Sequence, residues 1–183
     1  MQAFHEILPD YVWSAAYSVR VRASLDRTFA AISTADFGTS RYIRLMFMLR
    51  GLPRARLTID GFLAAGQCVL VREAPREITL GLLARPWQTS GVWRPITADE
   101  FFAMDEPGGL EGEFVRIIWG FRVLPDPGTP DGCRLMTETR IVPTDEVARR
   151  RFGRYWTWIA PHSGWVRRSM LQAIRKTAEA SVV

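Results

Sequence analysis

Residues 144–180 read TDEVARRRFGRYWTWIAPHSGWVRRSMLQAIRKTAEA, the one long helical pattern of this sequence. Thr144 can cap a helix, and Asp145 and Glu146 then place negative charge at the positive end of the helix dipole. Apolar residues follow at helical spacing on one face: Ala148, Phe152, Tyr155, Trp156, Ile159, Val166, Met170, Ile174 and Ala178. The pattern predicts a long C-terminal helix with one buried face and with Arg167, Arg175 and Lys176 outside.

Pro161 interrupts this pattern, because proline lacks a backbone N–H and crowds the preceding turn. A straight helix over residues 144–180 would be about 54 Å long at 1.5 Å per residue. A domain of this length has a radius of gyration of only about 16 Å. We therefore expect a bend or a break at Ala160–Pro161.

The sequence before residue 144 predicts short helices and antiparallel strands. Residues 11–23 alternate apolar and polar side chains, as a half-buried strand does. Two short helices, at 25–32 and 40–50, are expected to follow. Further strands are expected at 68–72, 77–84, 92–93, 113–124 and 133–142, with an irregular connection at 53–66 and a helical turn at 99–104.

This order predicts an α+β fold in a single domain spanning residues 1–183, because its helices gather on one face of an antiparallel sheet. A sheet this long tends to curl around the C-terminal helix, and incomplete filling of its inner face leaves a cavity. The helix at 40–50 is apolar nearly all round. It is either buried or a lid whose Met and Phe side chains face a ligand or a membrane, and we favour burial.

Composition is that of an ordinary globular protein, with 48% hydrophobic and 23% charged residues. The formal net charge is +5. From Thr144 onward there are eight Arg or Lys against three Asp or Glu, and the remainder balances at sixteen of each. The basic excess therefore falls on the outer face of the last helix, where charge is usually just solvated. A nucleic-acid or acidic-membrane partner is the less favoured interpretation.

Several chemistries lack their sequence signals. Cys68 and Cys133 have no metal-ligand spacing and are expected as reduced core thiols. No Ser/His/Asp motif, metal cluster or phosphate loop is present, so neither metal nor cofactor is expected. His162, next to Pro161, is expected at the surface. Residues 1–10 lack a signal peptide, and no apolar run reaches roughly 18 residues. We expect a cytoplasmic protein with no stable membrane insertion and no nucleic-acid partner.

The strand at 133–142 leaves one question open, because neighbouring residues of a strand point to opposite faces. If Leu135 and Ile141 mark the core side, Thr137 and Thr139 line the cavity while Glu138 and Arg140 pair at the surface. We favour this alternative. If the other face is inward, Glu138 could serve as a general base and Arg140 could stabilise an enolate or carboxylate.

Aromatic side chains on the inward faces are the candidates for the cavity wall: Trp13, Tyr17, Trp119, Phe121, Tyr155 and Trp156. Any one of them could equally well fill the core.

The element order resembles the START-like superfamily, also called SRPBCC or the helix-grip fold, over nearly the whole chain. Locally, residues 137–140 (TETR), 148–152 (ARRRF) and 155–161 resemble a bacterial branch of that superfamily without a generally established function. The resemblance implies a curved sheet around the C-terminal helix and a pocket for a hydrophobic molecule. It does not imply catalysis, since these families share no single catalytic motif.

Three functions follow as hypotheses. The first is binding of a lipid-like or aromatic small molecule, oriented by Tyr17, Thr137 or Tyr155. The second is a polyketide cyclase- or dehydratase-like enzyme, which requires Glu138 and Arg140 in the cavity. The third is a basic interaction surface at 149–154 and 167–168. We favour the first. The sequence determines neither the ligand nor the oligomeric state.

Overall fold

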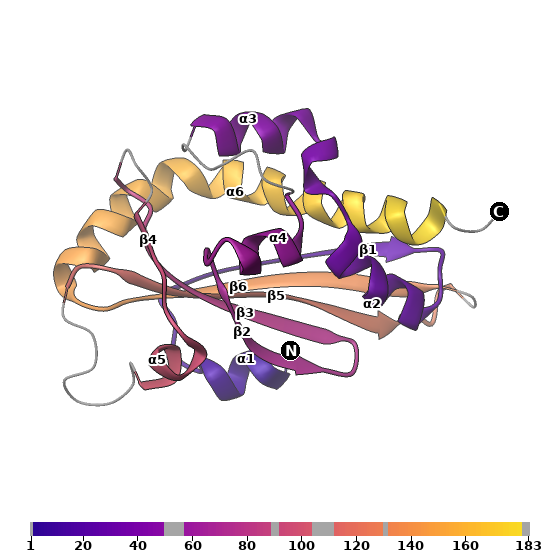
Figure 1. The fold of residues 1–183 in the computed structure, drawn as a ribbon, viewed down its shortest axis with the longest axis horizontal. Coiled ribbons are helices and arrows are strands. Elements are labelled where there is room, and N and C mark those ends of the chain that lie inside the picture. Colours follow the sequence, from indigo (N-terminus) through magenta and orange to yellow (C-terminus); the bar gives the residue numbers. More distant parts are fainter. Residues whose placement is uncertain (1, 50–56, 89–91, 104–111, 130–131, 181–183) are drawn as a thin grey trace.

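The structure is a computed structural model that describes residues 2–49, 57–88, 92–103, 112–129 and 132–180. One long helix, α6 (Glu146–Ala180), lies along a curved antiparallel sheet (Figure 1). The strands of this sheet are β1 (Trp13–Val21), β2 (Val69–Ala74), β3 (Glu77–Arg85), β4 (Val92–Arg94), β5 (Val115–Pro125) and β6 (Cys133–Pro143). The arrangement confirms the predicted α+β class.

The strand order is β1-β6-β5-β3-β2, and β4 pairs with the C-terminal residues of β3, from Leu83 to Arg85. All pairings are antiparallel. The register places Thr137 of β6 beside Tyr17 of β1 and Phe121 of β5. It also places Trp119 of β5 beside Thr139 of β6. Since paired residues point to the same face, these side chains all project toward α6.

The shorter helices are α1 (Gln2–Ile7), α2 (Leu25–Thr34), α3 (Arg41–Leu49), α4 (Ile59–Ala64) and α5 (Ala98–Ala103), with a 3₁₀ turn at Phe37–Thr39. Helices α2 and α3 confirm the two predicted after the first strand. Helix α4 lies in a stretch expected to be irregular, so that expectation was wrong. Its start is capped by Thr58, whose hydroxyl accepts a hydrogen bond from Gly61 N at 3.0 Å. Helix α1 was not predicted.

Helix α6 runs through Pro161 without a break and curves along the sheet (Figure 1). The expected irregularity is thus a bend, because the loss of one backbone donor does not end a helix whose inner face is packed. Gly164 lets this helix approach β1 closely. A Cβ built at Gly164 would lie 2.5 Å from the Tyr17 hydroxyl.

Helix α3 is neither buried all round nor exposed throughout. Ile43 is fully buried, whereas Leu45 is 47% and Met48 is 56% exposed. Met46 lines the cavity described below. The expectation of a helix buried on all sides was therefore wrong.

The sheet is covered on its outer face as well as its inner face. Phe4, Ile7 and Leu8 around α1 join Phe101 of α5 and Ile118 of β5 in a second hydrophobic cluster. Figure 1 shows α1 and α5 on the side of the sheet opposite α6. The prediction that all helices gather on one face was wrong in this respect. As a result, both faces of β5 are largely buried.

Candidate functional site

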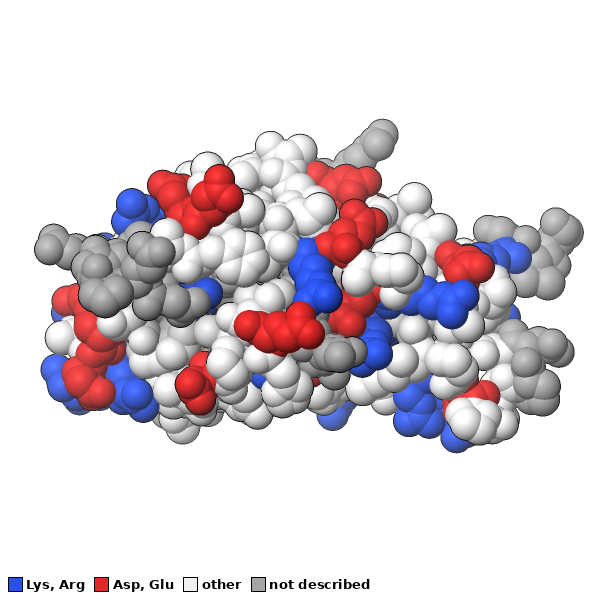
Figure 2. Space-filling model, turned by 90° about the horizontal axis from the view of Figure 1, so that it is seen from below, with Lys and Arg blue, Asp and Glu red and all other residues white. Residues whose placement is uncertain are grey.

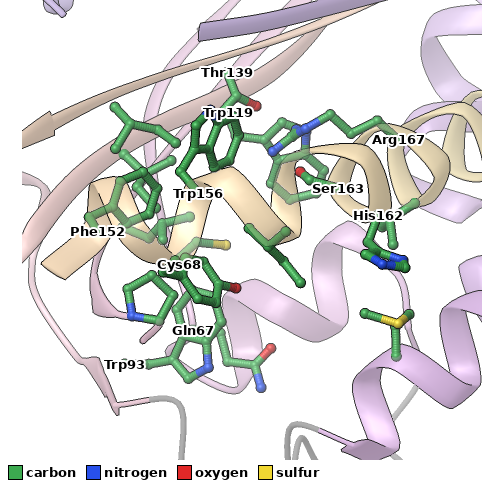
Figure 3. A pocket seen from close by; sticks show the side chains of 18 of the residues that line it. Gln67, Cys68, Trp93, Trp119, Thr139, Phe152, Trp156, His162, Ser163 and Arg167 are labelled. Atoms are coloured by element: carbon green, nitrogen blue, oxygen red, sulfur yellow. The ribbon is translucent and has the colours of Figure 1, made fainter. Parts of the chain in front are cut away.

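A cavity of about 210 Å³ lies between the inner face of the sheet and α6 (Figure 3). The sheet contributes alternate residues of its central strands, as one face of a pleated strand must. Helix α6 contributes residues at helical spacing from the opposite wall. The lining residues are Met46, Phe62, Gln67, Cys68, Leu82, Pro86, Trp93, Ile117, Trp119, Thr139, Ile141, Phe152, Tyr155, Trp156, Ile159, His162, Ser163, Val166, Arg167 and Met170.

The wall is mainly aromatic and aliphatic, and none of its described lining residues is Asp or Glu. Three lining residues have a buried polar atom with no hydrogen-bond partner among the described residues: Trp93 Nε1, Thr139 Oγ1 and Arg167 Nε. Each of these groups can donate a hydrogen bond. The cavity therefore offers donors to a ligand and no carboxylate.

Arg167 extends from α6 toward Trp119, and its guanidinium carbon lies 5.9 Å from the indole centroid (Figure 3). The prediction that Arg167 lies outside was wrong. Among the described residues, no carboxylate lies within ion-pair distance of it. The side chain is half-buried. Desolvation lowers the pKa of this guanidinium to about 10, and the nearby Tyr17 partly opposes this.

Arg167 nevertheless stays charged in the physiological range, because a guanidinium is effectively always protonated in proteins. A half-buried cation without a counter-charge among the described residues is costly for the folded state.

The structure places three of the seven predicted ligand-binding residues in the cavity wall: Trp119, Tyr155 and Trp156. The other four lie behind the wall. Trp13 packs on Phe152 with ring centroids 4.7 Å apart, and Phe121 packs on Trp119 at 5.3 Å. The guanidinium carbon of Arg168 lies over the ring of Tyr17, 4.9 Å from the centroid of that ring.

Thr137, the fourth, positions an aromatic wall residue. The Trp119 indole N–H donates to Thr137 Oγ1 at 3.2 Å, and that hydroxyl donates to the Gly120 carbonyl at 2.8 Å. Thr137 is 1% exposed. It thus fixes the orientation of Trp119 from behind.

Glu138 and Arg140 lie on the outer face of β6, away from the cavity, so the alternative that they face inward is wrong. Leu135 and Ile141 mark the inner face, as the favoured alternative has it. The pair is not simply at the surface, however. Arg140 is 3% exposed and donates to Glu138 Oε1 at 2.7 Å. It is buried under α1, and this leaves no role for the pair as acid and base in the cavity.

Thr137 and Thr139 make a matched pair for a stability test. Thr137→Val should lower the free energy of unfolding by about 1–3 kcal/mol, because it leaves the buried Trp119 N–H without an acceptor. Thr139→Val should change it by less than about 0.5 kcal/mol or raise it, since no described residue bonds that hydroxyl. Urea unfolding followed by circular dichroism measures both. Equal losses would contradict the assigned hydrogen bonds.

Cys68 and His162 were not predicted to line the cavity. His162 is exposed, as expected, and lines the cavity as well. Burial raises the pKa of the Cys68 thiol to about 12, which keeps it neutral and a poor nucleophile. His162 Nδ1 lies 2.9 Å from the Tyr42 hydroxyl. The described residues contain no cluster of three or more His, Cys, Asp or Glu suited to a metal ion. His162 follows Tyr155 and Ile159 at helical spacing, and this spacing could have placed it on the same wall of the cavity.

Fold and cavity together define an α+β protein with an apolar pocket between a curved sheet and its C-terminal helix. No family model and no curated protein matches the chain. A solved structure, that of TTHA0849 from Thermus thermophilus, aligns with 93% of this chain and 100% of its own at 8% sequence identity, with a TM-score of 0.33. None of the helices in the described part of the chain could cross a membrane.

Proposed function

We propose that this protein binds a small hydrophobic molecule in the cavity between its sheet and α6, as a START-like protein would. The observation that supports this is the cavity itself, about 210 Å³ and walled by aromatic and aliphatic side chains. Ligand pockets are typically concave, largely apolar and provided with a few convergent polar groups. Trp93, Thr139 and Arg167 supply those groups here.

The cavity is open to solvent on one side, since Tyr155, Trp156 and Ile159 of its wall are only half-buried. A hydrophobic molecule can therefore enter it. Binding removes apolar wall surface from water, which favours the complex by about 25 cal/mol per Å².

Native mass spectrometry of the purified protein, followed by denaturation and analysis of the released compounds, tests the proposal. We expect a discrete organic molecule with the wild-type protein. Ser163→Phe places a ring in the cavity and should abolish its retention. Gln172→Phe, at an exposed site of the same helix, is the control and should retain it. If the Ser163 variant retains the molecule, the ligand binds elsewhere. If the wild-type protein carries no molecule and also takes up no hydrophobic probe, the proposal is refuted.

The enzyme hypothesis has less support, because no described lining residue is a carboxylate. A cyclase- or dehydratase-like reaction in this cavity would depend on His162, paired with Tyr42, as its acid or base. Glu138 and Arg140 lie on the wrong face for that role.

The basic-surface hypothesis also has less support. Arg149 pairs with Glu146, Arg151 pairs with Glu113, and Arg167 enters the cavity. These ion pairs and the inward turn of Arg167 reduce the positive charge that α6 presents to a partner such as nucleic acid. On the opposite face, which bears α1 and α5, acidic and basic side chains are interspersed (Figure 2).

A further inference from the structure

Two donors of the cavity converge on a single indole. Thr139 pairs in register with Trp119 across β6 and β5, so the two side chains are neighbours on the inner face. The guanidinium of Arg167 approaches the same indole from α6. The indole N–H itself is bonded to Thr137 and is not available to a ligand. Trp119 is thus flanked by a hydroxyl and a cation (Figure 3).

Both donors lack partners within the described protein. Thr139 is 1% exposed, and its hydroxyl has no hydrogen-bond partner among the described residues. Arg167 has neither an acceptor for its Nε nor a carboxylate in reach there. Arg140 is more deeply buried than the half-buried Arg167, but it has Glu138 and two backbone carbonyls as acceptors. Buried polar atoms are normally satisfied, and Thr139 Oγ1 and Arg167 Nε stand out because both lie beside the same indole of the cavity wall.

We propose that the ligand is a small hydrophobic carboxylate whose carboxylate group is bound by Arg167 and Thr139, an inference that rests on the proposed function. A guanidinium matches a carboxylate in shape and can form two parallel charge-assisted hydrogen bonds with it. The carboxylate supplies the counter-charge that the cavity wall lacks. Its apolar body lies against Trp156, Phe152 and Ile117.

Isothermal titration calorimetry at pH 7 with two matched probe pairs tests this. The pairs are 2-naphthoate with 2-naphthamide, and decanoate with decanamide, so each carboxylate has a neutral partner of nearly the same shape. Wild-type protein should bind the carboxylates at least about 10-fold more tightly than the amides, as hydrogen bonds to charged groups are the stronger ones.

Arg167→Met should weaken carboxylate binding by about 10- to 100-fold and leave amide binding within about 3-fold of wild type. Arg168→Met removes the neighbouring charge outside the cavity and should change neither. The thermal midpoint of the ligand-free Arg167 variant should stay the same or rise, because a half-buried charge without a described counter-charge is removed. An arginine with a structural role would instead lower that midpoint.

Thr139→Val provides a second variant that keeps the side-chain volume, and it should lower carboxylate affinity by about 3- to 10-fold relative to amide affinity. If amides and carboxylates bind equally well and the Arg167 variant changes neither, the inference is overturned while the proposed function stands. If wild-type protein binds neither member of either pair and releases no ligand on denaturation, both are rejected.

Discussion

Arg140→Met is expected to lower the free energy of unfolding by about 3–5 kcal/mol, because it removes one member of a buried, hydrogen-bonded charged pair. Arg140 Nη1 donates to the carbonyls of Phe4 and Leu8, at 3.0 Å each. Its Nε donates to Glu138 Oε1 at 2.7 Å. The guanidinium also lies 4.6 Å from the ring centroid of Tyr11.

These contacts join β6 to the middle of α1 and to the residue that follows this helix. Without Arg140, the Leu8 carbonyl and the half-buried Glu138 carboxylate would lose this donor, and methionine would supply none. The Phe4 carbonyl would keep its bond from Leu8 N. Helix α1 covers Ile118 on the outer face, so its release would also expose that cluster. We therefore expect the N-terminal helix to detach before the sheet unfolds.

Urea unfolding gives the loss of stability, and limited proteolysis shows whether residues 2–10 become accessible in the Arg140 variant. Arg134→Met is the matched control on the same strand. Arg134 is 41% exposed, and its partner Asp126 also pairs with Arg20. The control should change stability by less than about 1 kcal/mol. A loss below about 1 kcal/mol for Arg140→Met would show that α1 is held by apolar contacts alone.

The parts of the fold that follow from periodicity were predictable. The alternation in residues 13–21 is the alternation of half-buried and exposed side chains that β1 has. The apolar stripe of residues 148–178 became the buried face of α6. In both elements one face meets the core and the other meets solvent, which is the condition under which a hydrophobic pattern is informative.

The face of β6 was harder to assign, because Arg140 is buried on one side and Thr137 on the other. A strand covered on both faces gives no polar face to read. The outer cover comes from α1, a helix of six residues without an acidic first turn. Its helical state depends less on local signals than on the tertiary contacts that Phe4 and Leu8 make with the sheet.

Arg167 shows a different limit of sequence patterns. By spacing it belongs to the inner face, because it lies three residues before Met170 and seven before Ile174, both of them buried. Its residue type, and not its position, led to the prediction that it lies outside. A charged residue within an apolar stripe is therefore a signal of an unusual site that a reading by residue type misses.

Gly120→Ala is expected to lower the free energy of unfolding by more than about 3 kcal/mol, beyond the usual range for an added methyl group in a core. A Cβ at Gly120 would lie 2.2 Å from the backbone oxygen of Ile78 on the neighbouring strand. It would also lie 3.2 Å from the ring of Phe4. A backbone oxygen cannot rotate away, so β3 and β5 must separate or α1 must move.

Gly153→Ala is the matched control with the opposite expected sign. Gly153 lies inside α6, and a Cβ there would meet only Trp13 Cζ2, at 3.7 Å, an ordinary contact distance. Alanine is favoured over glycine in a helix by about 1 kcal/mol, so this variant should be more stable than wild type. Urea unfolding of the two variants side by side separates the effect of the methyl group from that of its surroundings. A stabilised Gly120 variant would mean that β3 and β5 are further apart at this position than the structure has them.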